Sequence, residues 1–315
     1  MRKTLRFTII VFILLTAFSL QGIAQSTASF TYSESLLFVK AKINNSKAYT
    51  FLVNTGANAT VIDNKIANAL KLPVQSEKDE VLGTAGTEHI EIRKTNSIAV
   101  GSASVKNVQV TVRDMSNTML GGQRIDGVLG TDFLEHFCYT IDFKSKQITF
   151  ANKQMQPGKL RNIPFEMIDG IPRVAAKIDN SYQTYLNYNS GVSMPYSANS
   201  YVNISAKQWQ ELSKLNPYMS NGTAMSGQGV GGKLDLRSVK VSAIKLNTIN
   251  VQQPYLVVQA KEGYFKNDDA IGFFSNSTLE KFPKVTIDFI GKNIIVYDYK
   301  KTPKAPVKKT VIAQR

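Results

Sequence analysis

Short stretches in which apolar and polar residues alternate dominate the chain. This two-residue period predicts strands with one buried face, and Gly or Asn clusters such as Asn44-Asn45-Ser46 separate the stretches. A helical period is rarer. It predicts one helix from Asp63 to Leu70, one from Thr131 or Asp132 to Phe137, and one from Ser205 to Leu215 ahead of Pro217. The predicted strands of the first half cover residues 36–43, 48–53, 89–93, 97–100, 105–113 and 138–143.

The second half repeats the order of landmarks in the first half. In each half, an apolar run leads into Asn-Thr-Gly (Asn54) or Asn-Ser-Gly (Asn189), and a helix and a Gly-containing hairpin follow. Next come alternating strands, an apolar pair ending in Gly, a short helix and a Thr-Ile-Asp-Phe strand. Five landmarks in the same order indicate a repeat of two similar lobes rather than chance. The apolar-Gly segments are 127–130 and 270–272, the second short helix is expected at 277–282, and the hairpin tips lie at 83–86 and 227–232.

This layout resembles the two-lobed aspartic peptidases of the pepsin and retropepsin kind over residues 28–299, and the exported bacterial retropepsin-like proteins more than animal pepsins. The resemblance implies an all-β, bilobal fold with a pseudo-twofold repeat and a few short helices. It implies that Asn54 and Asn189 stand where the family carries its catalytic Asp. Thr55 and Ser190 match the hydroxyls that brace the two loops, next to Gly56 and Gly191. The resemblance also implies a frame formed by each apolar-Gly segment, and a flap at Gly83, Thr84 and Gly86 or at Gly227 and Gly229.

Peptide hydrolysis in that family needs two carboxylates that share one proton, so that one acts as acid and the other as base. A carboxamide is a very weak base and gives up no proton near neutral pH. General acid–base help contributes on the order of a hundredfold to ten-thousandfold per group. Asn54 and Asn189 therefore predict a groove that binds an extended peptide without cutting it. The two amides can hydrogen-bond to each other and to Thr55 and Ser190 without charge repulsion, so we expect a site that depends little on pH.

Other candidate chemistry is weaker. His89 and His136 have no Cys or carboxylate set at metal spacing, so no metal or cofactor is expected. No Gly-x-Ser-x-Gly elbow surrounds Ser193 or Ser226. The Gly-rich run 227–232 lacks the Lys-Ser/Thr ending of a phosphate loop. Asp126 and Asp269 precede the apolar-Gly segments, and the resemblance makes them structural. The single cysteine, Cys138, lies in an apolar run and is expected in the core.

The ends of the chain differ from the rest in composition. Residues 1–24 combine a basic start with an apolar stretch from Phe7 to Leu20, which predicts a signal peptide cleaved before Gln25 and an exported protein, in the periplasm, on the cell surface or secreted. An uncleaved amino-terminal anchor is the alternative reading. The predicted lobes cover residues 28–152 and 160–299, and residues 300–315 form a basic, disordered tail.

The net charge of +15 is unevenly distributed. Residues 28–152 contain 13 basic and 12 acidic side chains, whereas residues 300–315 contain six basic residues and no acidic ones. The tail could contact an anionic envelope surface weakly. Nucleic-acid binding has no further support, because basic and aromatic residues do not interleave along any predicted element.

Three functions remain open at this stage. The first is a monomeric, non-catalytic aspartic-peptidase homologue that binds a peptide or protein ligand. The second is an active aspartic endopeptidase that tolerates Asn, and the third is a structural, envelope-associated protein that uses the fold without a ligand.

Overall fold

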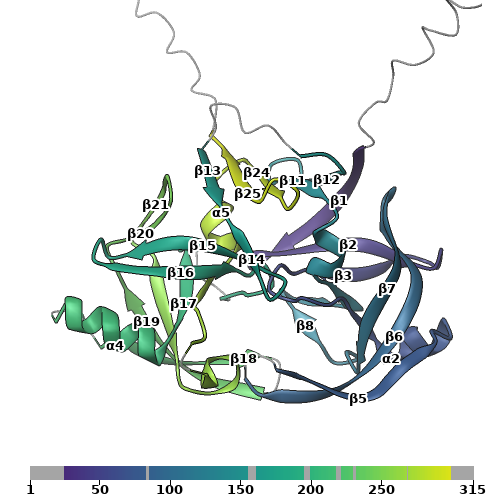
Figure 1. Ribbon diagram of the computed structural model, residues 1–315, viewed down its shortest axis with the longest axis horizontal. Coiled ribbons are helices and arrows are strands. Elements are labelled where there is room, and N and C mark those ends of the chain that lie inside the picture. The colour runs from purple at the N-terminus through teal and green to yellow at the C-terminus, as the bar shows by residue number, and fades with distance from the viewer. Residues whose placement is uncertain are drawn as a thin grey trace, which may run out of the picture.

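A computed structural model of the chain describes residues 25–82, 85–154, 161–194, 199–217, 221–229, 232–267 and 269–298. Two lobes lie side by side, and a group of strands joins them at one end (Figure 1). The predicted signal peptide (1–24) and basic tail (300–315) lie outside the described residues. None of the helices in the described part is long and apolar enough to span a membrane.

Among the described residues, the first half contributes twelve strands and two short helices. The apolar-polar alternation predicted for residues 36–43 is the pattern of β2, whose side chains alternate between core and solvent from Lys40 onward. Asp63 begins α2 by accepting a hydrogen bond from the Lys65 N–H at 2.9 Å. The elements are β1 (Gln25–Ser33), β2 (Leu36–Ile43), β3 (Tyr49–Val53), β4 (Val61–Asp63), α2 (Asn64–Ala69), β5 (Val74–Leu82), β6 (Thr87–Val100), β7 (Ala103–Arg113), β8 (Met119–Leu120), β9 (Gln123–Arg124), β10 (Gly127–Leu129), α3 (Thr131–Leu134), β11 (Cys138–Asp142) and β12 (Gln147–Ala151).

Among the described residues, the second half contributes thirteen strands, one α-helix of ten residues and two shorter helices. The helix predicted to start at Ser205 is α4, and Ser205 and Gln208 form a reciprocal capping box at its start. The elements are β13 (Arg161–Pro164), β14 (Glu166–Ile168), β15 (Ile171–Ile178), β16 (Tyr182–Tyr188), β17 (Tyr201–Ser205), α4 (Ala206–Leu215), β18 (Thr223–Gly229), β19 (Gly232–Lys240), β20 (Ala243–Leu246), β21 (Ile249–Gln252), β22 (Tyr255–Gln259), the 3-10 helix η1 (Gly263–Lys266), β23 (Phe273–Phe274), α5 (Asn276–Leu279), β24 (Lys284–Asp288) and β25 (Asn293–Tyr297).

Six bridging strands, β1, β11, β12, β13, β24 and β25, connect the halves at the top of Figure 1. The junction is the antiparallel pairing of β11 with β24, the two Thr-Ile-Asp strands. Thr140 lies opposite Thr286, and their hydroxyl oxygens are 2.7 Å apart. Below them we distinguish an N-terminal lobe (β2–β10, α2, α3) and a C-terminal lobe (β14–β23, α4, α5). The segment between the two predicted lobes, residues 153–159, falls between β12 and β13.

The core is continuous through the bridging strands. The Tyr139 ring packs at a tilt against the rings of Phe150 and Phe289 there, and all three residues are buried. Cys138 is 1% exposed, so its assignment to the core is confirmed. The bridging strands therefore join the buried cores of the two lobes at one end of the molecule.

Several sequence-based boundaries are wrong. The strands expected at 89–93 and 97–100 are one strand, β6, and the helix expected from Thr131 to Phe137 ends at Leu134. The helix expected at 277–282 is α5, Asn276–Leu279. His136 consequently lies beyond α3, where it is exposed.

Candidate functional site

The two Asn loops meet between the lobes. Asn54 follows β3 and Asn189 follows β16, and each begins a tight turn held by its own side chain. The Asn54 Oδ1 accepts a hydrogen bond from the Gly56 N–H at 2.7 Å, and the Asn189 Oδ1 accepts one from the Gly191 N–H at 3.0 Å. Asn favours such turns because its short side chain can bond to the backbone two residues ahead.

Thr55 and Ser190 lock these loops together by a reciprocal pair of hydrogen bonds. The Thr55 N–H donates to the Ser190 Oγ, and the Ser190 N–H donates to the Thr55 Oγ1, both at 3.0 Å. The hydroxyls then donate across the interface, Thr55 to the Tyr188 carbonyl at 2.7 Å and Ser190 to the Val53 carbonyl at 2.8 Å. Thr55 is fully buried and Ser190 is 2% exposed, so water does not compete for these bonds.

Gly56 and Gly191 allow the loops to approach this closely. A Cβ added to Gly56 would lie 2.1 Å from the Asn189 Cγ, and one added to Gly191 would lie 2.3 Å from the Asn54 Cγ. Each carboxamide therefore packs over the glycine of the opposite loop, where any side chain would collide. The described structure has no hydrogen bond between the two carboxamides, so the expectation that Asn54 and Asn189 bond to each other is wrong.

A short strand frames each loop from behind. β10 runs parallel to β3, and the Asn54 N–H donates to the Leu129 carbonyl at 3.0 Å. In the C-terminal lobe, β23 runs parallel to β16, and the Asn189 N–H donates to the Phe274 carbonyl at 2.9 Å. The second frame is thus Phe273–Phe274, and the expectation that residues 270–272 form it is wrong. Gly272 instead precedes β23, and its carbonyl accepts from the Asn187 N–H.

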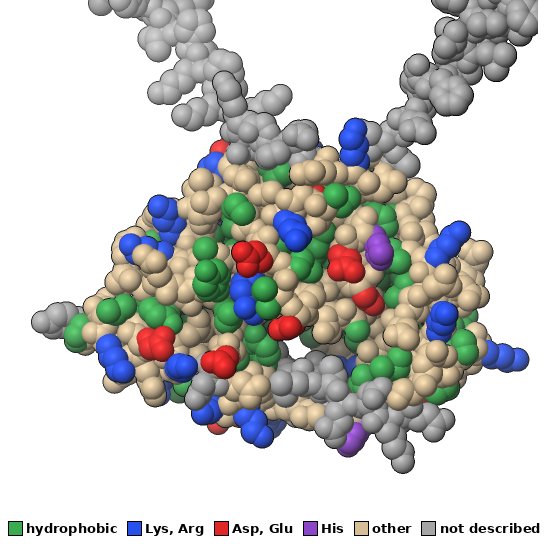
Figure 2. Space-filling view, viewed as in Figure 1, with side chains coloured by type: hydrophobic (Ala, Val, Ile, Leu, Met, Phe, Trp, Pro, Cys, Tyr) green, Lys and Arg blue, Asp and Glu red, His purple; other side chains and the backbone are tan. Residues whose placement is uncertain are grey.

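The predicted flap residues lie on two hairpins. Gly227 and Gly229 belong to β18, which pairs with β19, and Gly86 lies between β5 and β6. Gly83 and Thr84 lie outside the described residues. β5 and β18 run along the edge of the two lobes that is opposite to the bridging strands (Figure 1). Figure 2 shows an opening between the lobes on this side.

The side chains of the paired loops carry no ionisable group. Asn54 and Asn189 are half-buried, so each could hold a ligand by its amide but could not exchange a proton with it. Among the described residues, no three His, Cys, Asp or Glu side chains come together as metal ligands. Asp126 has a structural contact, because its Oδ2 accepts from the Thr50 N–H at 2.8 Å.

A cavity of about 400 Å³ adjoins the turn between β1 and β2. Burial and the neighbouring Glu280 carboxylate raise the pKa of Tyr32 far above its usual value, and the Tyr32 hydroxyl donates to Glu280. The Ser193 hydroxyl, two residues beyond Gly191, is 3.5 Å from Glu34. The cavity is lined by Tyr32, Ser33, Glu34, Ser35, Phe143 and Glu280.

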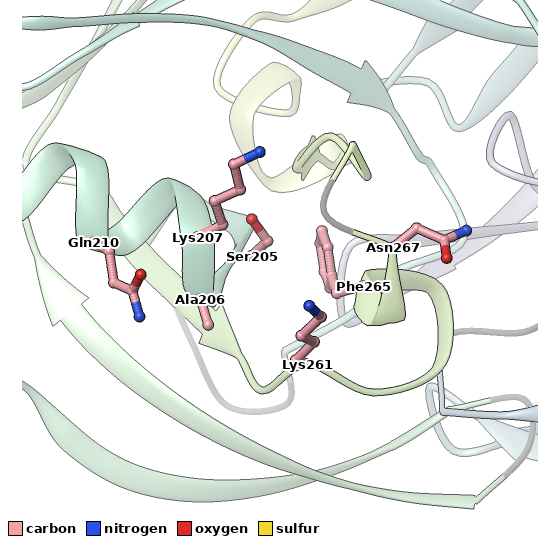
Figure 3. A pocket seen from close by; sticks show the side chains of 7 residues that line it. All are labelled: Ser205, Ala206, Lys207, Gln210, Lys261, Phe265 and Asn267. Carbon is pink, nitrogen blue, oxygen red and sulfur yellow. The ribbon is translucent and has the colours of Figure 1, made fainter.

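A second cavity of about 330 Å³ lies in the C-terminal lobe, away from the paired loops. Its seven lining side chains come from the start of α4 on one side and from the segment around η1 on the other (Figure 3). Neither of these two cavities is lined by Asn54 or Asn189.

Comparison with known proteins is consistent with this geometry. Residues 39–133 match a family model described as "Aspartyl protease". The fold is that of the aspartic proteinases: the crystal structure of an aspartic proteinase from Irpex lacteus superposes with a TM-score of 0.54 at 13% identity, over 89% of this chain and 99% of that chain. No curated protein matches the chain. The family match, which lies within the N-terminal half of the chain, and the fold together support an aspartic-peptidase-like protein.

Proposed function

We propose that this chain is an exported, non-catalytic aspartic-peptidase homologue that binds an extended peptide between its lobes. In this proposal Asn54 and Asn189 occupy the two positions at which active relatives carry their catalytic Asp. The observation that supports it best is the packing of the two carboxamides over Gly191 and Gly56, with Thr55 and Ser190 bracing the loops. The site thus keeps a braced, closely packed frame around two groups that cannot transfer a proton.

The edges of the hairpins supply the means of binding. β5 and β18 are the outermost strands of their sheets, so their outer backbone groups have no neighbouring strand among the described residues. An extended peptide can add hydrogen bonds to such an edge while alternate side chains enter pockets. The cavity beside Glu34 is one such pocket, because Ser193 connects it to the Asn189 loop.

One experiment separates this proposal from an active peptidase. The chain from Gln25 onward is incubated with a mixed peptide library between pH 3 and pH 7, and cleavage is read by mass spectrometry. The double variant Asn54→Asp/Asn189→Asp is assayed beside it, with and without pepstatin. We expect no cleavage by the unmodified chain and pepstatin-sensitive cleavage by the variant. Pepstatin-sensitive cleavage by the unmodified chain would show that it is a peptidase.

A matched control adds the same two charges elsewhere. Asn45 and Asn250 are exposed, one in each lobe, and Asn45→Asp/Asn250→Asp should not produce cleavage. Binding is measured on the same library by affinity selection on the immobilised chain. If neither the unmodified chain nor the Asp variant retains any peptide, the binding proposal is wrong and a structural role for the fold is favoured.

A further inference from the structure

Two side chains outside the Asn loops occupy matching positions in the two lobes. The sequences Leu134-Glu135-His136-Phe137 and Leu279-Glu280-Lys281-Phe282 follow the two frame strands. Thr131 lies three residues before Leu134, and Asn276 lies three residues before Leu279, so the two occupy equivalent positions in the two lobes. Thr131 is the first residue of α3, and Asn276 is the first residue of α5. Both are almost completely buried, at 1% exposure each.

Thr131 connects its own loop to the opposite lobe. Its hydroxyl lies 2.6 Å from the Gly170 carbonyl, in the turn between β14 and β15 of the C-terminal lobe, and 3.3 Å from the Ala57 carbonyl. The Thr131 N–H also donates to the Ala57 carbonyl at 2.8 Å. Since Ala57 directly follows Gly56, one residue holds both the Asn54 loop and a turn of the other lobe.

Asn276 makes the corresponding contacts in the opposite direction. Its Nδ2 donates to the Ser35 carbonyl at 2.9 Å, in the turn between β1 and β2, and lies 3.4 Å from the Ser190 carbonyl in the Asn189 loop. Its Oδ1 accepts a hydrogen bond from the Tyr188 hydroxyl at 2.6 Å. The Asn276 carboxamide is therefore oriented from one side by Tyr188 and donates on the other to both lobes.

The two turns are built for this approach. Ser35 has φ +62° and Gly170 has φ +77°, so each turn presents its carbonyl from a left-handed residue. A Cβ on Gly170 would lie 3.1 Å from the Asn58 Cβ, which places this turn against the Asn54 loop. The Ser35 turn has one more contact with the C-terminal lobe, because the Ser35 hydroxyl donates a hydrogen bond to the Glu280 carboxylate at 2.9 Å.

We infer that Thr131 and Asn276 are paired positioning residues that set the separation of the lobes at the Asn54 and Asn189 loops. The bridging strands hold the lobes at one end of the molecule, whereas these two side chains fix them beside the site. The reciprocal hydrogen bonds of Thr55 and Ser190 align the two loops with each other. Thr131 and Asn276 connect each loop to the first hairpin of the opposite lobe. This inference does not rest on the proposed peptide binding.

The first test measures the lobe separation directly. Spin labels on cysteines at Lys42 and Lys245, which are exposed in β2 and β20, report the distance between lobes in a Cys138→Ala background. Thr131→Val removes the hydroxyl at nearly constant shape, and Asn276→Asp keeps the acceptor for Tyr188 but removes the Nδ2 donor. We expect either variant to broaden the distribution of distances between the two spin labels. Thr131→Ser retains the hydroxyl, so we expect its distance distribution to stay as narrow as that of the unmodified chain.

The second test separates positioning from general stability. Amide hydrogen exchange is followed at Thr55 and Ser190 and at core strands far from the loops. We expect exchange at Thr55 and Ser190 to rise roughly tenfold in Thr131→Val and Asn276→Asp, while the buried amides of β12, in the bridging strands, change much less. If all amides accelerate equally and the distance distribution stays narrow, the two residues contribute only to global stability and the inference is wrong.

Discussion

The Thr55 Oγ1 donates a hydrogen bond to the Tyr188 carbonyl at 2.7 Å while it accepts one from the Ser190 N–H at 3.0 Å. One hydroxyl thus satisfies two backbone groups of the opposite lobe in a fully buried position. Ser190 does the same for Thr55 and Val53. The two loops form one hydrogen-bonded unit, so a substitution in either loop removes hydrogen bonds from both.

Thr55→Val should reduce the free energy of unfolding by about 2–4 kcal/mol, because the Ser190 N–H and the Tyr188 carbonyl lose their partners without gaining water. Thr55→Ser keeps the hydroxyl and should cost less than about 1 kcal/mol. Urea unfolding followed by circular dichroism measures both. Equal midpoints for the Val and Ser variants would mean that the hydroxyl does not carry the interaction.

Gly56→Ala should destabilise the protein by about 3 kcal/mol, because the new methyl group would overlap the Asn189 side chain. The three atoms nearest to the added methyl group all belong to the Asn189 side chain, so a substitution at Asn189 can relieve this collision. Asn189→Ala removes all three of the nearest atoms, and we expect Gly56→Ala to cost much less in that background. Unfolding free energies of the two single variants and the double variant give the coupling. Simple additivity would show that the methyl group is excluded by something other than Asn189.

Asp179 should contribute stability that disappears in acid. Burial by itself would raise the pKa of Asp179, but the hydrogen bonds from Ser242 and Asn216 outweigh it and lower the pKa below its usual value. A carboxyl group with a depressed folded pKa stabilises the fold above its unfolded pKa of about 3.9, and this contribution is lost as the pH falls through the folded pKa. Asp179→Asn should therefore be less stable than the unmodified chain at pH 7 and equally stable near pH 2.

The check on Asp179 is a series of urea midpoints between pH 2 and pH 7. Asp235→Asn provides the control, because it removes the same charge from an exposed position of β19. A stability difference for Asp179→Asn that persists unchanged to pH 2 would mean that its cause is not the ionised carboxylate.

The sequence predicted the paired loops because their determinants are local. Asn54 and Asn189 bond to their own Gly N–H groups, and glycine two residues later is required wherever the opposite side chain fills the space of a Cβ. The existence of β2, β7 and α4 could be predicted for the same reason, since their burial periods and the Ser205 cap lie within each element.

The second frame strand could not be predicted in the same way. Ala270-Ile271-Gly272-Phe273-Phe274 contains two apolar pairs, one on each side of Gly272, and only the parallel pairing of Phe273 and Phe274 with β16 selects one of them. The sequence pattern predicts two strands, 89–93 and 97–100, where the structure has the single strand β6, and the reason is also a long-range contact. Its polar residue Thr95 is 1% exposed and donates to the Asn44 Oδ1 at 2.7 Å, a partner 51 residues away. The contacts of Thr131 and Asn276 are also long-range, although the repeated Leu-Glu-x-Phe could have placed the two residues opposite each other.

Gln208 should support the Asn189 loop from a distance. It is 7% exposed, and its Oε1 accepts from the Ser205 N–H at 3.1 Å and from the Gly272 N–H at 3.0 Å. Gly272 precedes β23, whose Phe274 carbonyl accepts from the Asn189 N–H. Gln208→Leu leaves both donors without a partner and should cost about 2–4 kcal/mol, with faster amide exchange at Asn189.

Ser205→Ala removes only the helix cap, so it should cost about 1 kcal/mol and leave exchange at Asn189 unchanged. Gln208→Glu retains an acceptor for both N–H groups and should fall between them. If Gln208→Leu is no more destabilising than Ser205→Ala, Gln208 acts only as part of the α4 cap, and the frame of the second loop does not depend on it.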